Sequence, residues 1–353
     1  MTPKERFRAC INRSGPDRPP FSPIAGDGRV IPDLMRAAGV SDYDAFLTRS
    51  GVDFRFVWPE YAGPCLKTFG DGSREDIWGV VYGKNEIEGG FYTEPVYRPH
   101  EKIDSVREAG KLRFPEPDWH DYSNINKQID DFGGNAVLAG SMGHFDFING
   151  VAFGRGYERV MTDIADENPV YLYLVEKRFD YFYGQLDSIL SAGNGRIDAV
   201  QMGEDLGSQL GPLISPRAFE KLFARKYEAA FKLAHGRGAK TMLHCCGAVR
   251  AFLPLLIELG LDILDVVHVD AAGMELSGLK KDFGDKLAFS GTLSVQTLLN
   301  GGTPEEIKRA IESRKALFKE GGLMLGPCNV LQADMPFENF VAMCEGITGL
   351  KIK

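Results

Sequence analysis

The sequence predicts an α/β fold, specifically a (β/α)8 TIM barrel with a β-rich insertion in its N-terminal third. Beyond residue 135, short apolar runs alternate with amphipathic stretches, which is typical of parallel strands joined by helices. Two earlier apolar runs bring the strand count to eight, the number that closes a barrel. An open doubly wound sheet would give a similar pattern. However, no Gly-x-Gly-x-x-Gly segment opens a helix after the early strands, which weighs against dinucleotide binding.

The N-terminal third supplies the first two strands and the insertion. Strand-like runs at 20–25 and 52–58 flank helix-like stretches at 30–38 and 42–49. Residues 65–98 are rich in glycine and β-formers, so we expect a β-hairpin insertion there that could act as a lid. At 353 residues the chain fits one large barrel domain spanning 1–353.

The remaining two thirds supply six more strands and the helices between them. The expected strands are 136–141, 198–204, 240–245, 262–267, 286–291 and 322–326. The expected helices include 216–237, 249–259, 276–283, 303–318 and 337–347. The last but one has a clear start, because Thr303 is suited to the N-cap and Pro304 to the first helical position.

Composition narrows the class of protein. The chain is 44% hydrophobic and 25% charged, as in ordinary globular proteins, and its net charge of -8 disfavours nucleic acid or an anionic membrane as partner. We expect a cytoplasmic protein, because there is neither a signal-peptide pattern nor an apolar run of about 18 residues. Six cysteines in a chain of this length suit thiolate chemistry in a reducing compartment. Cys10, Cys65 and Cys344 do not lie near other candidate ligands in the sequence, and we expect a structural or bystander role for them.

Soft metal ligands follow several of the expected strands. His244 and Cys246 close one strand, Cys328 follows another, and Glu204 and Asp205 end a third. Residues at the carboxyl ends of barrel strands converge on one face, and one imidazole with two thiolates is a zinc-preferring set. Strand alternation turns Cys245 away from its neighbours, toward the helical layer, as a small core residue.

Two stretches, HCCGAVRAFLPLLIELGLDILDVV (244–267) and AAGMELSGLKKDFGDKLAFSGTLSVQTLLNGGTPEEIK (271–308), resemble the uroporphyrinogen decarboxylase superfamily. The resemblance covers roughly residues 195–350 and implies a (β/α)8 barrel. One branch comprises metal-free decarboxylases with an arginine-bearing N-terminal segment. The corresponding stretch here, PFSPIAGDGR (20–29), supplies only Arg29 and adds Asp27. The other branch comprises methyltransferases with a His-x-Cys and distant Cys zinc set, which His244, Cys246 and Cys328 match.

The resemblance therefore implies a zinc-dependent methyltransferase. It would move a methyl group between a small organic methyl donor, such as a methoxylated aromatic, and a cobalt corrinoid (cobalamin) carried by a partner protein. Aromatic residues in the first third favour such a donor: Phe54, Phe56, Trp58, Tyr61, Trp78 and Tyr82. The alternatives are a methylcobalamin:thiol (coenzyme M-type) methyltransferase, a metal-free uroporphyrinogen decarboxylase and a non-catalytic module with a structural metal. A homodimer is also expected, because such barrels often pair.

Further residues have expected roles around the zinc ligands His244, Cys246 and Cys328. Glu204 is the expected fourth, displaceable ligand or a general acid, and could exchange roles with the substrate-binding Asp205, since only one of the two should reach the metal. His144 could donate a proton to the leaving group or line the pocket. The other candidates are Gln201 and Asn329, as substrate-binding or ligand-orienting residues, Trp58 as a substrate-binding residue, and His268, whose role is open.

Overall fold

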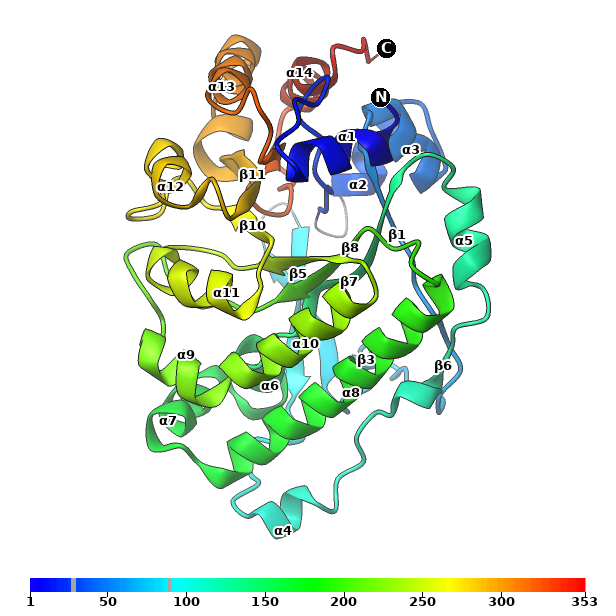
Figure 1. Ribbon diagram of the computed structural model, residues 1–353. Helices are drawn as coiled ribbons and strands as arrows, with labels where there is room; N and C mark the ends of the chain where they lie inside the picture. Colours follow the sequence, from blue (N-terminus) through cyan, green and yellow to red (C-terminus); the bar gives the residue numbers. More distant parts are fainter. Residues whose placement is uncertain (27–29, 88–89, 353) are drawn as a thin grey trace.

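The computed structural model describes residues 1–26, 30–87 and 90–352, and its centre is a curved sheet of seven parallel strands (Figure 1). The strands lie side by side in the order β1-β7-β8-β9-β10-β11-β12. Their bounds are β1 Phe54–Phe56, β7 Ala136–Phe145, β8 Ala199–Gly203, β9 Lys240–His244, β10 Ile263–Val267, β11 Ala288–Leu293 and β12 Leu323–Pro327. Each agrees with an expected strand, although β7 extends past 141 through an irregularity between Gly140 and Phe145.

Residues 20–22 take the eighth place and close the sheet into a barrel. Phe21 forms a parallel bridge with Leu325 of β12. The Ser22 amide donates to the Leu325 carbonyl, and the Leu325 amide donates to the Pro20 carbonyl, both at 2.8 Å. On the other side, the Asp53 amide donates to the Phe21 carbonyl at 3.2 Å, just before β1. The predicted (β/α)8 barrel is thereby confirmed, with a much shorter first strand than the run 20–25 suggested.

Helices surround the barrel (Figure 1). Their bounds are α1 Pro3–Ile11, α2 Val30–Ala37, α3 Tyr43–Ser50, α4 Val106–Ala109, α5 Ile125–Asp131, α6 Asn149–Arg155, α7 Tyr157–Asp166, α8 Pro169–Gly193, α9 Pro216–Leu222, α10 Ala224–Gly236, α11 Leu253–Leu259, α12 Leu276–Phe283, α13 Pro304–Leu317 and α14 Phe337–Thr348. The single helix expected over 216–237 is two, because Phe223, fully buried between them, leaves helical geometry. Across the described part of the chain, no helix combines the length and apolar character needed to cross a membrane.

Strand alternation divides each strand between two cores. Inward residues pack together inside the barrel, namely Phe54, Ala136, Leu138, Ala199, Met242, Ile263, Ala288 and Met324. Phe7, Cys10 and Ile11 of α1 belong to the same cluster, with the Phe7 and Phe54 rings 5.4 Å apart and nearly perpendicular. α1 therefore plugs the N-terminal end of the barrel. Two residues further along β8, β9 and β10, the inward positions are Gln201, His244 and Asp265, so polarity begins toward the C-terminal end.

The expected β-rich insertion is present as a three-stranded antiparallel sheet of β3 Arg74–Glu75, β4 Val81–Ile87 and β5 Gly90–Tyr97. A second small pair joins β2 Glu60–Tyr61 to β6 His120–Asp121. Trp78, between β3 and β4, packs edge-on against Tyr181 of α8 and under the Arg178 guanidinium at 5.1 Å. These contacts fix the insertion to the outside of the barrel, and its action as a lid stays a prediction.

Candidate metal and substrate site

A first group of side chains that could hold a metal ion, here called a metal-binding group, lies where β8 and β9 end. One donor atom each of Asp205, His244 and Cys246 lies within 4.8 Å of the other two. His244 Nε2 is 3.4 Å from Cys246 Sγ, and the Cys246 amide donates to Asp205 Oδ1 at 3.2 Å. His244 is the last residue of β9 and Cys246 follows two residues later, so the His-x-Cys spacing brings both side chains to the same side of the chain.

His244 is oriented by residues behind it. Its Nδ1 lies 3.1 Å from Asp265 Oδ2, and Gln201 Nε2 donates to the same oxygen at 2.9 Å. Burial alone would lower the pKa of His244, but hydrogen bonds to Asp265 and Cys246 raise this pKa well above its ordinary value. Carboxylates commonly hold metal-binding histidines in this way. Nδ1 therefore serves orientation, and Nε2 faces Cys246 as the donor available to a metal.

A second group lies after β10 and β12. Donor atoms of His268, Asp270 and Cys328 also lie within 4.8 Å of one another. Burial raises the pKa of the Cys328 thiol to about 12, and the charges of Asp270 and Cys246 act in the same direction. Cys246 is thus close enough to Cys328 for its charge to affect the pKa of the Cys328 thiol. Even so, no group of three within the described ranges contains His244, Cys246 and Cys328 together, so the predicted ligand set is divided between adjacent groups.

Glu204 faces away from both groups. Its carboxylate accepts hydrogen bonds from the Phe147 amide at 2.9 Å, the Ile148 amide at 3.1 Å and the Tyr227 hydroxyl at 2.9 Å. Burial, reinforced by Asp146, raises the pKa of Glu204 well above its ordinary value. The geometry bears on which of the two carboxylates could reach a metal ion. Asp205 lies in a metal-binding group, whereas Glu204 binds the segment after β7.

Asp146 is a second buried carboxyl group at this end of the barrel, 8% exposed. Burial raises its pKa to about 6, and Asp205 adds to this effect while Arg178 opposes it. Its Oδ1 accepts from the Asn149 amide at 3.0 Å. Sequence reasoning missed both Asp146 and Asp265. Asp265 could have been found, because it occupies an inward position of β10 two residues after Ile263.

His144 lies near the end of β7, outside both metal-binding groups. Its Nδ1 is 2.8 Å from Ser141 Oγ and its Nε2 is 2.9 Å from Gln185 Oε1. The Gln185 oxygen can only accept, so His144 carries its proton on Nε2 and accepts from Ser141 at Nδ1. Burial lowers the pKa of His144 to about 4. The imidazole is therefore neutral at pH 7, and its ring is held against Phe182 with centroids 4.7 Å apart.

A cavity of about 390 Å³ reaches Gln201 of β8, and mostly apolar residues line it. They include Ile24, Phe54, Phe56, Trp58 and Met142, with Ser141 and Gln201 among the polar ones. Trp58 is 47% exposed at its rim, whereas Tyr61, Trp78 and Tyr82 are not among its lining residues. Because Gln201 lines the cavity and also holds Asp265, it links the cavity wall to His244.

The other predicted residues occupy supporting or undescribed positions. Asn329 Nδ2 donates to Cys246 Sγ at 3.4 Å, which places it next to a predicted metal ligand. Cys245 is fully buried in the layer between barrel and helices, as strand alternation predicted. Asp27 and Arg29 lie outside the described residues.

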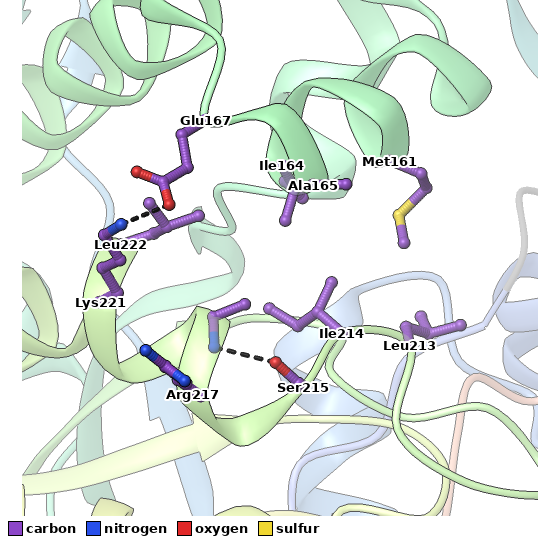
Figure 2. A pocket seen from close by; sticks show the side chains of 11 residues that line it. Met161, Ile164, Ala165, Glu167, Leu213, Ile214, Ser215, Arg217, Lys221 and Leu222 are labelled. Atoms are coloured by element: carbon purple, nitrogen blue, oxygen red, sulfur yellow. Dashed lines mark hydrogen bonds and ion pairs between the residues drawn. The ribbon is translucent and has the colours of Figure 1, made fainter.

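A separate surface pocket of about 420 Å³ lies between α7 and α9 (Figure 2). Met161, Ile164 and Leu213 give it apolar walls, and a Glu167–Lys221 ion pair lies at its edge. None of the residues in the two metal-binding groups lines it. No residue of these groups lines the cavity beside Gln201 either, but Gln201 holds Asp265 behind His244. The cavity beside Gln201 is the better candidate for substrate because of this link.

Comparisons with known proteins agree with this architecture. The family model described as uroporphyrinogen decarboxylase (URO-D) matches residues 133–349, more than half of the chain. The chain is 30% identical over 174 residues to "Methylcobamide:CoM methyltransferase MtaA" of Methanosarcina barkeri (strain Fusaro / DSM 804). That match covers 47% of this chain and 48% of the relative, so the chain spans about half of the relative's length. A solved structure described as a methyltransferase from Methanosarcina mazei superposes with a TM-score of 0.66 at 17% identity, covering 99% of both chains, which shows the shared fold.

Proposed function

The chain belongs to the uroporphyrinogen decarboxylase family, and from this starting point we propose that it is a zinc-dependent methyltransferase. It would move a methyl group between a small organic methyl donor, such as a methoxylated aromatic, and a cobalt corrinoid carried by a partner protein. The observation that carries the proposal is the gathering of histidine, cysteine and aspartate donors at one end of the barrel. Because its thiols must stay reduced, we place the protein in the cytoplasm.

The donor chemistry fits zinc. Imidazole and thiolate are preferred zinc ligands, and His244, Cys246 and Cys328 would hold the ion, with Asp205 close by. Zinc, when bound, would act as a Lewis acid that favours the thiolate form of a thiol or polarises the heteroatom of a methyl donor. In the adjacent group, the buried His268 ring has no hydrogen-bond partner among the described residues, as expected beside an ion.

The chain's own residues would prepare this site. Asp265 and Gln201 orient His244, and the Asn329 amide donates to Cys246. Phe56 and Trp58 form an apolar wall that suits a small organic molecule and displaces water. We assign Glu204 a positioning role, since its hydrogen bonds fix the backbone at 147 and 148. His144 would fix the Ser141 hydroxyl in the cavity wall.

The cavity argues against decarboxylation of a poly-anionic tetrapyrrole. Of the lining residues in the described part of the chain, Arg55 alone is cationic. Its guanidinium is already engaged by Asp44, by Thr48 and by the backbone carbonyls of Val52 and Phe54. Little positive charge is left for substrate carboxylates.

A thiol acceptor is the second candidate function. It is favoured by the similarity to a relative whose name specifies methyl transfer between a methylcobamide and CoM. The same donor set would serve, because a thiol is also a zinc ligand. Assays with methylcobalamin plus thiols, and with methyl ethers plus reduced cobalamin, would identify the direction from the change in the visible spectrum of the corrinoid.

The deciding experiment combines metal analysis with methyl transfer. We expect zinc in the purified wild-type protein. Cys246→Ala and Cys328→Ala should lose methyl transfer while keeping wild-type circular dichroism, because a catalytic ion supports chemistry more than folding. Cys65→Ala is the control, since this exposed thiol lies outside both groups. A Cys328→Ala protein that transfers methyl groups at the wild-type rate would contradict the proposal.

A further inference from the structure

We propose that Ser141 selects methyl donors that also carry a hydroxyl group, such as a methoxyphenol, because its own hydroxyl can only accept a hydrogen bond from a ligand in the cavity. The inference rests on the proposed function and extends it, since it specifies which small organic donors fit. Ser141 and Gln201 both line the cavity of about 390 Å³.

A bulge in β7 carries this serine. The register between β7 and β8 breaks between Gly140 and Phe145, so residues 141–144 form the bulge. Bulges beside active sites commonly redirect a side chain. Arg178 of α8 fixes the bulge, because its Nη2 donates to the Gly143 carbonyl at 2.8 Å and its Nε donates to the Phe145 carbonyl. The backbone that presents the serine is therefore tied to the helical layer.

A chain of hydrogen bonds that leads away from the cavity sets the direction of the Ser141 hydroxyl. Gln185 Nε2 donates to the Tyr181 hydroxyl at 3.0 Å, and Gln185 Oε1 lies 2.9 Å from His144 Nε2. A carbonyl oxygen can only accept, so His144 Nε2 carries the hydrogen of the neutral ring. His144 Nδ1 is then an acceptor, and Ser141 Oγ donates to it at 2.8 Å.

This direction leaves Ser141 as an acceptor toward the cavity. A hydroxyl group has one hydrogen to donate and two positions that accept. The hydrogen goes to His144, and one accepting position receives the Gly143 amide at 3.2 Å. The second accepting position is the one that a ligand can use, so the ligand has to bring the hydrogen.

The other polar side chains of the cavity wall add to this preference. Gln201 Nε2 donates to Asp265, and no hydrogen bond within the described part of the chain reaches Gln201 Oε1. The Tyr43 hydroxyl donates to the Ile24 carbonyl at 3.3 Å, which leaves its oxygen to accept. The indole N–H of Trp58 is a donor, but it lies at the exposed rim. An uncharged ligand with its own O–H group complements this wall, because apolar surroundings disfavour a charged one.

A methyl ether without a donor group would bind less well. It would remove water from the Ser141 oxygen without replacing the lost hydrogen bond, and an acceptor left without a partner costs free energy. Sites that hydrogen-bond a substrate hydroxyl discriminate against analogues that lack it. Ser141 would therefore act as a specificity-determining residue, and His144 and Gln185 as the residues that position its hydroxyl.

Calorimetric titration of the purified full-length protein tests the selection with two probes. Guaiacol is a methoxyphenol, and veratrole is its methyl ether, which has no hydrogen to donate. We expect the wild type to prefer guaiacol, and the ratio of the two affinities should fall roughly 2- to 10-fold in Ser141→Ala, the range of one neutral hydrogen bond. Ser188→Ala is the control, because the Ser188 hydroxyl bonds to the Gly184 carbonyl within α8 and does not line the cavity.

A second variant tests the direction of the hydrogen bonds separately from the shape of the cavity. Gln185→Met keeps the volume but removes the acceptor for His144 Nε2, so the ring can carry its hydrogen on Nδ1 and donate to Ser141. The preference for guaiacol should fall in this variant too. Nitrogen NMR of histidine-labelled wild-type protein should show the hydrogen of His144 on Nε2, with the signals identified by their loss in His144→Phe.

The outcomes separate this proposal from the proposed function. An unchanged affinity ratio in Ser141→Ala, a hydrogen on Nδ1 of His144 in the wild type, or no binding of guaiacol would each overturn the selection by Ser141. None of these results concerns the metal ligands, so the proposed function would stand. Selective binding of guaiacol without methyl transfer from any methyl ether to reduced cobalamin would contradict the proposed function and leave Ser141 as the acceptor for a hydroxyl-bearing ligand.

Discussion

The two ends of the barrel differ in how completely their buried polar groups are paired. At the N-terminal end, Arg6 and Arg18 both pair with the buried Asp53, whose carboxylate also accepts from the Phe21 amide at 2.6 Å. At the C-terminal end, Asp146 is buried with a raised pKa and His268 has no hydrogen-bond partner among the described residues. The buried carboxylate at the N-terminal end is fully paired, whereas the C-terminal end retains a carboxyl group with a raised pKa and an imidazole without a partner.

This difference indicates a division of labour between stability and chemistry. In barrels of this kind, the C-terminal ends of the strands carry function and the N-terminal ends carry stability. Buried polar groups without partners reduce the stability of a fold, and a functional role is one reason why they are kept. Substitutions at the two ends should therefore have effects of opposite sign.

The largest effect is expected at the N-terminal end. Asp53→Ala removes the carboxylate that pairs with Arg18 and one of the two carboxylates that pair with Arg6. The free energy of unfolding should therefore fall by about 3–5 kcal/mol. Urea denaturation measures the loss. Asp33→Ala breaks an exposed pair with Arg36 and should cost less than about 1 kcal/mol. Equal losses of unfolding free energy in the two variants would contradict a special contribution of the N-terminal end to stability.

The opposite sign is expected for Asp146→Asn. The fold raises the pKa of Asp146 from 3.8 to about 6, so its contribution to stability is full below pH 3.8 and is lost as the pH rises through 6. Asparagine stays neutral and keeps the acceptor for the Asn149 amide. The variant should therefore be more stable than the wild type at pH 7.5, by up to about 3 kcal/mol.

The gain in Asp146→Asn should vanish near pH 4, where the wild-type carboxyl is protonated. Urea denaturation at the two pH values checks this, and Asp166→Asn, at an exposed position of α7, is the control. A variant less stable than the wild type at pH 7.5 would show that the charge of Asp146 stabilises the fold.

The smallest change in stability is expected for a substitution at the C-terminal end that weakens metal binding. Asp265→Asn removes the charge that orients His244, so zinc affinity should fall by roughly 10- to 100-fold with little change in unfolding. Competition with a chelator measures it. Asp262→Asn alters the other end of the same strand, where Asp262 pairs with Lys240, and should leave zinc affinity unchanged. Equal affinity in the Asp265 variant would contradict the proposed role of His244.

Much of the barrel could be predicted from sequence because its strands are continuous apolar runs. The limits of that signal appear at Gly140, with φ of +79°, where β7 bends and continues past its expected end. The longest helix, α8, could have been predicted, since the buried Val175, Phe182 and Ile189 recur at steps of seven residues. The plugging of the barrel by α1 depends on contacts between distant segments, which local patterns do not encode.

The positions of site residues could be predicted where strand alternation determines them. They could not be predicted where the conformation of a loop determines them. The neighbouring positions of His244, the last residue of β9, and Cys246, two residues beyond it, follow from their spacing. The division of Cys328 and His268 into a second group depends on loop conformations after β10 and β12, which periodicity does not describe. Whether Glu204 or Asp205 faces the metal depends in turn on the backbone after β7, whose amides bind Glu204.

The closure of the barrel at Phe21 has a consequence for ligand size. β11 and β12 are in register over five residues, but residues 20–22 join β12 through the single pair Phe21 and Leu325. Residues 23–25, which line the cavity, follow this narrow seam directly. The Gly26 and Leu331 pair anchors the other end of this segment, so residues 23–25 are held at their two ends, whereas β11 and β12 pair along five residues. We expect a wider ligand to be accommodated by outward bowing of residues 23–25, with the β11–β12 ladder kept intact.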